Sequence, residues 1–421
     1  MIGLIIDLDD QWNITVLEPE NVPGIQDEMQ AVRDALRHPF NSSPLDKIVD
    51  SNSRVGIIFN DITRATPNHI ILPAILRELD HIPRENITLF NALGTHRTNT
   101  GRELRYLLFD EMVDTYRIVQ NDCYRREMQT YLGKTSRGTD IYVNTVLMEC
   151  DVKILTGFIE PHFFAGFSGG GKAVMPGMAG LETILRNHGA DMIDDPYSVW
   201  GEIDRNPIQQ EIREIASRVK CDFIVNVTMN HDHQITGVFC GDLITAHNAG
   251  CKAVREIAMK PVEHPFDIVV TTNSGYPLDQ NLYQTVKGMS GAAKIVKQGG
   301  SIIIASECRD GVPDHGLYRD LLVSANDPED LLNTIRQPGF LKQDQWEAQI
   351  QALVQKKADV YVYSDYLAPS VIESLLLKSC TDIRGTIQRL LNDCSEDTRI
   401  CVLPQGPLTI PYVQERMGHH Y

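Results

Sequence analysis

The stretch Val55-Gly-Ile-Ile-Phe-Asn-Asp-Ile-Thr-Arg64 sets the fold class, because a short apolar run rich in β-branched residues ends directly in polar side chains. Such a run is typical of a strand that is covered on both faces of a sheet. The chain repeats the pattern, and helical stretches such as Pro73–Leu79 and Gln284–Val296 lie between the runs. This alternation predicts an α/β protein with mostly parallel sheets. The expected strands are Val55–Phe59, Ile87–Phe90, Val152–Leu155, Phe223–Val227, Phe266–Thr271, Ser301–Ala305, Val360–Tyr363 and Ile400–Leu403.

The length of the chain, 421 residues, is more than one hydrophobic core usually serves and predicts two α/β domains. The segment Lys260-Pro-Val-Glu-His-Pro265 carries two prolines between patterned regions and is the expected linker. We therefore expect an N-terminal cofactor-binding and catalytic domain over residues 1–262. A Rossmann-like α/β domain should follow over 263–403, with the active site in the cleft between the two. The tail, residues 404–421, is expected to pack back on the first domain.

Composition excludes several classes of protein. The formal net charge of −17 disfavours nucleic acid and anionic lipid as partners. No run approaches the roughly 18 apolar residues of a membrane helix, and the first residues lack the basic region of a signal peptide, so a cytoplasmic location is expected. The nine cysteines include no C-x-x-C pair, which argues against a disulfide framework and a zinc ribbon.

Polar clusters follow four of the expected strands. They are Asp61-Ile-Thr-Arg64, Gly94-Thr-His-Arg97, Glu160-Pro-His162 and Asn273-Ser-Gly-Tyr-Pro277. Ligands of open α/β sheets bind beyond the carboxyl ends of the strands. Any one cluster is also compatible with ordinary turn chemistry, but four in the same topological position indicate one shared site.

The most informative segment is Gly157-Phe-Ile-Glu-Pro-His-Phe-Phe-Ala-Gly-Phe-Ser-Gly-Gly-Gly-Lys-Ala-Val-Met-Pro-Gly177. Its glycines, Gly169, Gly170 and Gly171, would let backbone N–H groups approach an anion, and Lys172 adds a positive charge. The stretch Gly166–Lys172 also fits the phosphate-binding pattern G-x-x-x-x-G-K, but Ala173 stands where that motif needs Ser or Thr for Mg²⁺. A nucleotide triphosphatase and a purely structural glycine turn both remain open at this point. A helix is expected to begin near Gly180 and to carry His188.

Taken together, these motifs resemble the lactate racemase family of nickel-pincer racemases and epimerases, and the resemblance runs over nearly the whole chain. Asp61-Ile-Thr-Arg64 is similar to the family's D-x-T-R element, and Gly94-Thr-His96 to its G-T-H element. His162, Lys172 ten residues on and His188 sixteen further match the family's spacing. Tyr283-Gln-Thr-Val-Lys287 resembles its Y-Q-x-x-K element, and Trp346 falls near the expected aromatic residue.

This resemblance implies a cofactor and its attachment site. The family's cofactor is a nickel-pincer nucleotide, a pyridinium-3-thioamide-5-thiocarboxylic acid mononucleotide that binds Ni²⁺ through two sulfurs and a ring carbon. Lys172 matches the lysine that carries it covalently, and His188 matches the protein's nickel ligand, for which imidazole is suited. Asp61, Thr63, Ser168 and the three glycines are candidates for contacts with its ribose and phosphate.

The resemblance also implies a reaction, the inversion of C2 in a small 2-hydroxy acid through a 2-keto acid, by proton-coupled hydride transfer. His96 and His162 match the two acid/base residues, one on each face of the substrate. Arg64 and Lys287 match cations for the substrate carboxylate, while Tyr283, Gln284 and Trp346 would line the pocket.

The partners expected from this assignment are a small 2-hydroxy acid and the enzymes that mature the cofactor, and a homo-oligomer is possible. Three alternatives stay open: an epimerase of a larger sugar acid with the same cofactor, a nucleotide-binding enzyme with a P-loop-like turn, and a protein that only stores a nickel nucleotide. The pair His231-Asp-His233 is interpreted as a surface loop, not as a metal site.

Overall fold

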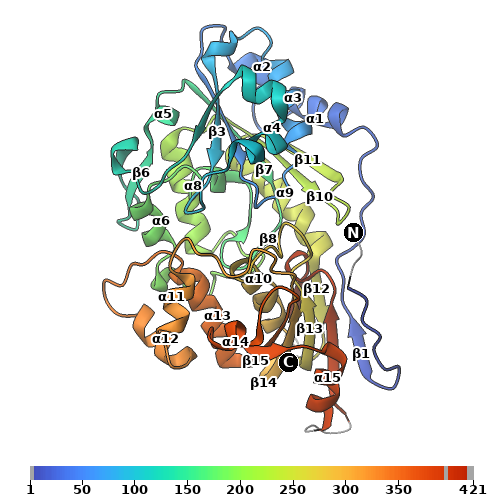
Figure 1. The fold of residues 1–421 in the computed structure, drawn as a ribbon. Helices are drawn as coiled ribbons and strands as arrows, with labels where there is room; N and C mark the ends of the chain where they lie inside the picture. The colour runs from blue at the N-terminus through green and yellow to red at the C-terminus, as the bar shows by residue number, and fades with distance from the viewer. Residues whose placement is uncertain (1–3, 393–396, 415–421) are drawn as a thin grey trace, which may run out of the picture. The chain divides into compact units, whose positions relative to one another are not determined.

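A computed structural model describes residues 4–392 and 397–414 of the chain, and it divides the polypeptide into two compact units. The middle unit comprises Asn21–Ile257. The terminal unit combines the residues up to Glu20 with the chain from Ala258 onward. Figure 1 shows the main sheet of each unit.

The middle unit is built on a six-stranded sheet in the order β11-β10-β7-β2-β3-β4, in which only β10 and β11 pair antiparallel. The central strands are buried along nearly their whole length, as their unbroken apolar sequences predict. The strands are β2 (Val55–Asn60), β3 (Ile87–Ala92), β4 (Arg117–Gln120), β7 (Val152–Phe158), β10 (Phe223–Met229) and β11 (Ile235–Gly241). A hairpin of β5 (Gln129–Lys134) with β6 (Asp140–Asn144) and a short pair, β8 (Pro161–His162) with β9 (Gly166–Phe167), stand outside this sheet.

Helices cover the sheet of the middle unit, and their ends follow ordinary capping chemistry. Helix α8 begins behind Asn206, whose side chain accepts the Gln209 N–H, and it ends at Lys220 in the left-handed conformation. Helix α4 begins with a capping box between Thr100 and Glu103. The helices are α1 (Glu28–Arg37), α2 (Leu45–Ile48), α3 (Asn68–Glu78), α4 (Gly101–Thr115), α5 (Thr145–Met148), α6 (Leu181–Asn187), α7 (Ala190–Ile193), α8 (Pro207–Val219) and α9 (Leu243–Ala258), with the short 3-10 turns η1 (Arg84–Asn86), η2 (Arg126–Met128) and η3 (Gly170–Ala173).

The terminal unit contains a second six-stranded sheet, which is parallel throughout, in the order β1-β17-β13-β14-β15-β16. Its strands are β1 (Asn13–Val16), β13 (Phe266–Thr272), β14 (Val296–Ala305), β15 (Ala358–Tyr363), β16 (Lys378–Cys380) and β17 (Arg399–Leu403), while β12 (Met259–Val262) and β18 (Ile410–Val413) form a separate pair. Its helices are α10 (Leu282–Ala293), α11 (Tyr318–Val323), α12 (Pro328–Ile335), α13 (Gln345–Lys357), α14 (Pro369–Glu373), α15 (Ile383–Asn392) and the 3-10 turn η4 (Gly406–Leu408).

The predicted α/β class, with two domains and mostly parallel sheets, is confirmed, and all eight expected strands are present. The domain limits differ from the expectation. The N-terminal strand β1 pairs with β17 of the terminal unit, so the first residues do not belong to the domain that follows them. In the described part of the tail, β18 pairs with β12 of the terminal unit and not with the middle unit; residues 415–421 lie outside the described residues.

The expected linker Lys260–Pro265 is in part a strand. Residues Met259–Val262 form β12, and Lys260 and Pro261 pair in parallel register with Pro411 and Tyr412. A pair of only two strands leaves an edge on each strand, where a proline that lacks its N–H is tolerated. The two prolines therefore lie just beyond the boundary at Ile257, partly in a strand and not in a free linker.

Candidate active site

Three of the four predicted polar clusters lie at one edge of the middle sheet, beyond the carboxyl ends of neighbouring parallel strands. Asp61–Arg64 follows β2, Gly94–Arg97 follows β3 and Glu160–His162 follows β7. The fourth cluster, Asn273–Pro277, follows β13, which belongs to the other sheet. The middle unit therefore gathers a candidate site at the carboxyl edge of its own sheet.

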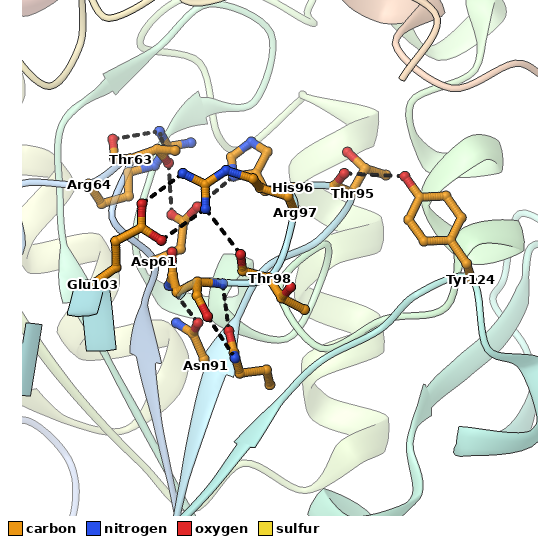
Figure 2. A network of polar contacts seen from close by, with 12 residues as sticks. Asp61, Thr63, Arg64, Asn91, Thr95, His96, Arg97, Thr98, Glu103 and Tyr124 are labelled. Atoms are coloured by element: carbon orange, nitrogen blue, oxygen red, sulfur yellow. Dashed lines mark hydrogen bonds and ion pairs between the residues drawn. The ribbon is translucent and has the colours of Figure 1, made fainter. Parts of the chain in front are cut away.

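Asp61 and His96 form a hydrogen-bonded pair at this edge (Figure 2). The His96 Nδ1 lies 2.8 Å from the Asp61 Oδ2, and the Thr63 hydroxyl donates to the other oxygen, Asp61 Oδ1, at 2.7 Å. Because a carboxylate only accepts, Asp61 fixes a proton on His96 Nδ1 and leaves the lone pair of the neutral ring on Nε2. Asp61 is thus a positioning residue for His96, a partnership that the sequence pattern did not predict.

The charge of Asp61 is maintained although the side chain is buried. Burial acts to raise the pKa of the carboxyl, but His96, Arg64 and the Thr63 hydroxyl outweigh it, and the net pKa is below the ordinary value. Arg64 lies beside the pair, with Nη1 3.3 Å from both the carbonyl oxygen and the hydroxyl of Thr63. Asp61 therefore stays an ionised carboxylate at neutral pH.

The loop that carries His96 is held at its C-terminal side by two further sets of contacts (Figure 2). Arg97 makes a two-pronged ion pair with Glu103, at 2.9 and 2.7 Å. The Asn99 amide donates to Asn91 Oδ1 at 2.7 Å, and the Asn99 backbone exchanges hydrogen bonds with the Gln120 side chain. This ring of contacts fixes the loop between β3 and α4.

The other three matched residues of the middle unit meet around one aromatic ring, Phe164. The ring centroid of Phe164 lies 4.6 Å from that of His162 and 4.9 Å from that of His188, and the Lys172 Nζ lies 5.7 Å from it. His162 and His188 are 7% and 4% exposed. Phe164 was not predicted as a site residue, because no local pattern in the sequence marks it as the centre of this cluster.

The two histidines of this cluster have different surroundings. The Ala165 N–H donates to His162 Nδ1 at 3.3 Å, which places the proton of the neutral His162 ring on Nε2. Burial, with the charge of Lys172 as a further cause, holds the pKa of His188 well below its ordinary value. His188 is therefore neutral at pH 7, the form in which imidazole binds a metal.

The glycine turn before Lys172 is closely packed against the protein. The Gly170 N–H donates to Asn226 Oδ1 at 2.7 Å, and a Cβ at Gly170 would approach the His247 ring to 2.7 Å. A Cβ at Gly169 would lie 2.9 Å from Asn226 Oδ1, and one at Gly171 would lie 3.0 Å from Ile212. Since Gly169 and Gly170 also have positive φ, the run shapes the turn that presents Lys172.

Ser168 has a comparable structural role. Its hydroxyl donates to the Phe158 carbonyl at 3.0 Å and accepts the Glu160 N–H at 3.0 Å, so it connects the end of β7 with the glycine turn. Asn226, His247 and Ser168 together hold this turn; Asn226 and His247 were not foreseen, since their contacts join distant parts of the chain.

A P-loop geometry is not present. Gly170–Ala173 forms a four-residue 3-10 turn that follows the short strand β9, whereas a P-loop joins a core strand to a long helix. The side chain of Ala173 is buried and offers no hydroxyl for Mg²⁺. The triphosphatase interpretation is therefore not supported.

The four matched residues of the terminal unit belong to two helices, α10 and α13. Tyr283, Gln284 and Lys287 lie on the first turns of α10, and Trp346 lies near the start of α13. The Trp346 Nε1–H donates to the Tyr283 hydroxyl at 2.9 Å, which joins two of the predicted pocket residues. Gln284 and Lys287 are buried, at 4% and 7% exposure.

Other signals in the sequence do not mark sites. His231 is exposed next to Asp232, and His233 occupies a positive-φ turn, as expected for a surface loop. Over residues 4–392 and 397–414, no group of three or more His, Cys, Asp or Glu side chains could hold a metal ion. None of the described helices is both long and apolar enough to cross a membrane.

Buried His247 predicts a dependence of stability on pH. Burial lowers its pKa to about 4, from an unfolded value near 6.5. The folded pKa is the depressed one, so His247 contributes stability that is complete above about pH 6.5 and is lost as the pH falls toward about 4. We expect urea unfolding to show a loss of about 2 kcal/mol between about pH 7 and about pH 5 from this group.

The variant His247→Gln keeps a donor for the Ser168 carbonyl, which His247 Nε2 contacts at 2.9 Å, but it cannot titrate. Its unfolding free energy should therefore fall less steeply with acid than that of the wild type. His231→Gln, at an exposed position, should follow the wild-type curve. Equal slopes for wild type and His247→Gln would contradict the assignment.

The fold and site define an α/β enzyme with a cluster of histidines at the carboxyl edge of a parallel sheet, and comparison with known proteins identifies its family. Residues 3–201 match the lactate racemase N-terminal domain and residues 262–410 match the lactate racemase C-terminal domain. Two lactate racemases, from Thermoanaerobacterium thermosaccharolyticum and Lactiplantibacillus plantarum, are each 35% identical over 382 residues, which is 90% of this chain and 89% and 90% of theirs. The chain belongs to the lactate racemase family, and it is an isomerase of the racemase type.

Two solved structures share the fold of this chain. The lactate racemase apoprotein from Thermoanaerobacterium thermosaccharolyticum superposes with a TM-score of 0.90 at 34% identity, covering 98% of this chain and 97% of that one. A protein from Thermotoga maritima, at 18% identity, shares the fold with a TM-score of 0.72, covering 92% of this chain and 98% of that one.

Proposed function

We propose that this enzyme inverts C2 of a small 2-hydroxy acid, with lactate as the first candidate, by proton-coupled hydride transfer through a 2-keto acid. The names of the two racemase relatives support lactate as the starting point. The proposal includes a nickel-pincer nucleotide attached to Lys172, and enzymes that mature this cofactor as partners. His96 and His162 are proposed as the acid/base residues.

The observation that carries the proposal is the opposite hydrogen bonding of these two histidines. Asp61 holds a proton on His96 Nδ1, so His96 Nε2 is an acceptor. The Ala165 N–H donates to His162 Nδ1, so His162 Nε2 holds the proton in the neutral ring. Inversion through a 2-keto acid needs one group that takes the hydroxyl proton and another that returns a proton to oxygen. The neutral rings suit these two roles, because His96 Nε2 can accept a proton and His162 Nε2 can donate one.

The residues around Phe164 fit the proposed cofactor. His188 offers a neutral imidazole, a donor suited to Ni²⁺, and Lys172 is presented by a turn whose backbone is fixed by Asn226 and His247. In this proposal the nucleotide would supply sulfur and carbon donors to nickel, so the protein would need to supply only the one nitrogen donor of His188. The chemistry that it supplies when bound is the reversible acceptance of the C2 hydrogen with its electron pair. Asp61, Thr63, Ser168 and the three glycines act in this scheme mainly by holding His96 and the Lys172 turn in place.

Arg64 and Lys287 are proposed to bind the substrate carboxylate, with Tyr283, Gln284 and Trp346 lining the pocket. A dicarboxylate would need a further cation, but Arg97 and Arg309 make two-pronged ion pairs with Glu103 and Glu307. This pairing favours a monocarboxylate over a dicarboxylate such as malate. Epimerisation of a larger sugar acid is the second candidate, because the same chemistry would serve it.

The test is a panel of single-enantiomer 2-hydroxy acids, given to protein co-expressed with the cofactor maturation enzymes and analysed by chiral chromatography. We expect both enantiomers of one small monocarboxylate to converge on a racemic mixture, and only in nickel-loaded protein. The double variant His96→Ala/His162→Ala should lose inversion and keep its fold. Inversion that persists in this variant, or without nickel, would falsify the proposal.

A further inference from the structure

A buried chain of hydrogen bonds leads away from His188 to a carboxylate in the middle of the protein. The His188 Nδ1 lies 2.9 Å from the Asn187 Oδ1, and the Asn187 amide lies 2.8 Å from the Glu211 Oε2. The Thr135 hydroxyl, at the end of the β5–β6 hairpin, donates to the other carboxylate oxygen at 2.7 Å. Glu211 and Asn187 are 1% and 0% exposed.

Two backbone groups, one that can only donate and one that can only accept, fix which atoms donate in this series of hydrogen bonds. The Thr139 N–H can only donate, and it does so to the Thr135 Oγ1 at 3.1 Å, which turns the Thr135 hydroxyl proton toward Glu211. The Ile208 carbonyl can only accept, and it receives a bond of 3.4 Å from the Asn187 Nδ2. The Asn187 NH₂ group must therefore face Ile208 and Glu211, and its carbonyl oxygen must face His188.

An amide carbonyl that faces the ring accepts a hydrogen bond and cannot donate one, so the ring nitrogen next to it must carry the hydrogen. We propose that Asn187 and Glu211 are positioning residues that hold His188 as the Nδ1–H tautomer, with its lone pair on Nε2. Metal-binding histidines usually donate their second ring N–H to such a partner, which fixes the tautomer and the orientation of the ring. That His188 then presents Nε2 to nickel rests on the proposed function; the tautomer itself does not.

Helix α8 and the β5–β6 hairpin give this arrangement its rigidity. Glu211 lies in the buried face of α8, and one turn further Glu214 accepts the Ser136 N–H and hydroxyl at the tip of the hairpin. The N-cap of the same helix, Asn206, donates to the Phe164 carbonyl at 2.8 Å. One helix therefore orients both the imidazole of His188 and the segment whose aromatic ring packs against it.

His247 provides an internal control, because its contacts require the opposite tautomer. Its Nε2 lies 2.9 Å from the Ser168 carbonyl, which only accepts, and the Arg213 Nη2, which only donates, lies 3.5 Å from its Nδ1. His247 should therefore carry its proton on Nε2. Its environment does not include Asn187 or Glu211, so it reports whether a variant remains folded.

The experiment is ¹⁵N NMR of the apoprotein with ring-labelled histidine, in which His188→Gln and His247→Gln identify the two rings. We expect His188 to show a protonated Nδ1 and an unprotonated Nε2, and His247 the reverse. In Asn187→Leu, the acceptor is removed and the fixed Nδ1–H pattern of His188 should be lost, while the His247 signals stay in place. Glu211→Gln should shift the His188 nitrogen signals without moving those of His247.

In nickel-loaded protein, the variants Asn187→Leu and Glu211→Gln should release nickel to a chelator about 10- to 100-fold faster than the wild type. A wild-type His188 with its proton on Nε2, or variants whose His188 signals match the wild type, would overturn the inference even if the enzyme is a nickel racemase. Conversely, the predicted tautomer in a protein that never acquires nickel would support this inference and contradict the proposed function.

Discussion

Lys172→Arg is expected to abolish both cofactor attachment and inversion. Arginine keeps a positive charge beside the Phe164 ring, which Lys172 Nζ contacts at 5.7 Å, so the turn should fold as before. A guanidinium does not provide the primary amine that the proposed covalent attachment needs. Because the hydride transfer of the proposed mechanism depends on the bound nucleotide, activity should fall by at least about 10⁴-fold.

Intact-mass spectrometry with peptide mapping measures the first part of this prediction. Protein co-expressed with the maturation enzymes should carry an adduct on the peptide that contains Lys172, and Lys172→Arg should carry none. Lys134→Arg is the matched control, because Lys134 is an exposed residue paired with Asp140, and it should keep both adduct and activity. An unmodified Lys172 in active protein, or an adduct on another lysine, would require a different attachment site.

The eight expected strands could be predicted because each is marked by a local run of apolar residues. Val55–Phe59 and Val152–Leu155 are apolar without interruption, and both are central, buried strands. The first strand, Asn13–Val16, was missed because it is short, lies at the edge of its sheet and is only partly buried. It pairs with β17, almost 400 residues later in the chain, and not with the sheet whose strands follow it directly in sequence. This choice depends on tertiary packing, which leaves no local pattern in the sequence.

Candidate site residues could be predicted where they belong to a short sequence motif. They could not be predicted where their role depends on a contact between distant parts of the chain. His96, His162, Lys172 and His188 were predicted from motifs that resemble those of the lactate racemase family, and the structure brings three of them next to Phe164. The residues that orient them were not predicted in that role: Asp61 was expected to contact the cofactor, and its bond to His96 appears only in the folded structure. The bond from Gly170 to Asn226 spans 56 positions, and no local pattern in the sequence marks Asn226.

Asp61→Asn is the substitution expected to test this principle most directly. The carboxylate accepts from both Thr63 and His96, at 2.7 and 2.8 Å. An asparagine has one carbonyl oxygen and one NH₂ group, and an NH₂ group facing His96 would force its Nδ1 to accept. The proton would then move to Nε2, where the proposed mechanism needs a lone pair. The shape of the site would be nearly unchanged, yet kcat should fall on the order of 10²- to 10⁴-fold.

Thr63→Val is the matched control, since it removes one hydrogen bond to Asp61 but keeps the carboxylate against His96, and its kcat should fall by less than about tenfold. Both variants should retain the Lys172 adduct, which separates loss of the base from loss of the cofactor. The pKa of Asp61 is held below its ordinary value, so the carboxylate is ionised at every pH above about 4 and the deficit of Asp61→Asn should persist across the neutral range. A kcat within about threefold of wild type for Asp61→Asn would show that this carboxylate does not set the tautomer of His96. The assignment of His96 as the base would then be contradicted.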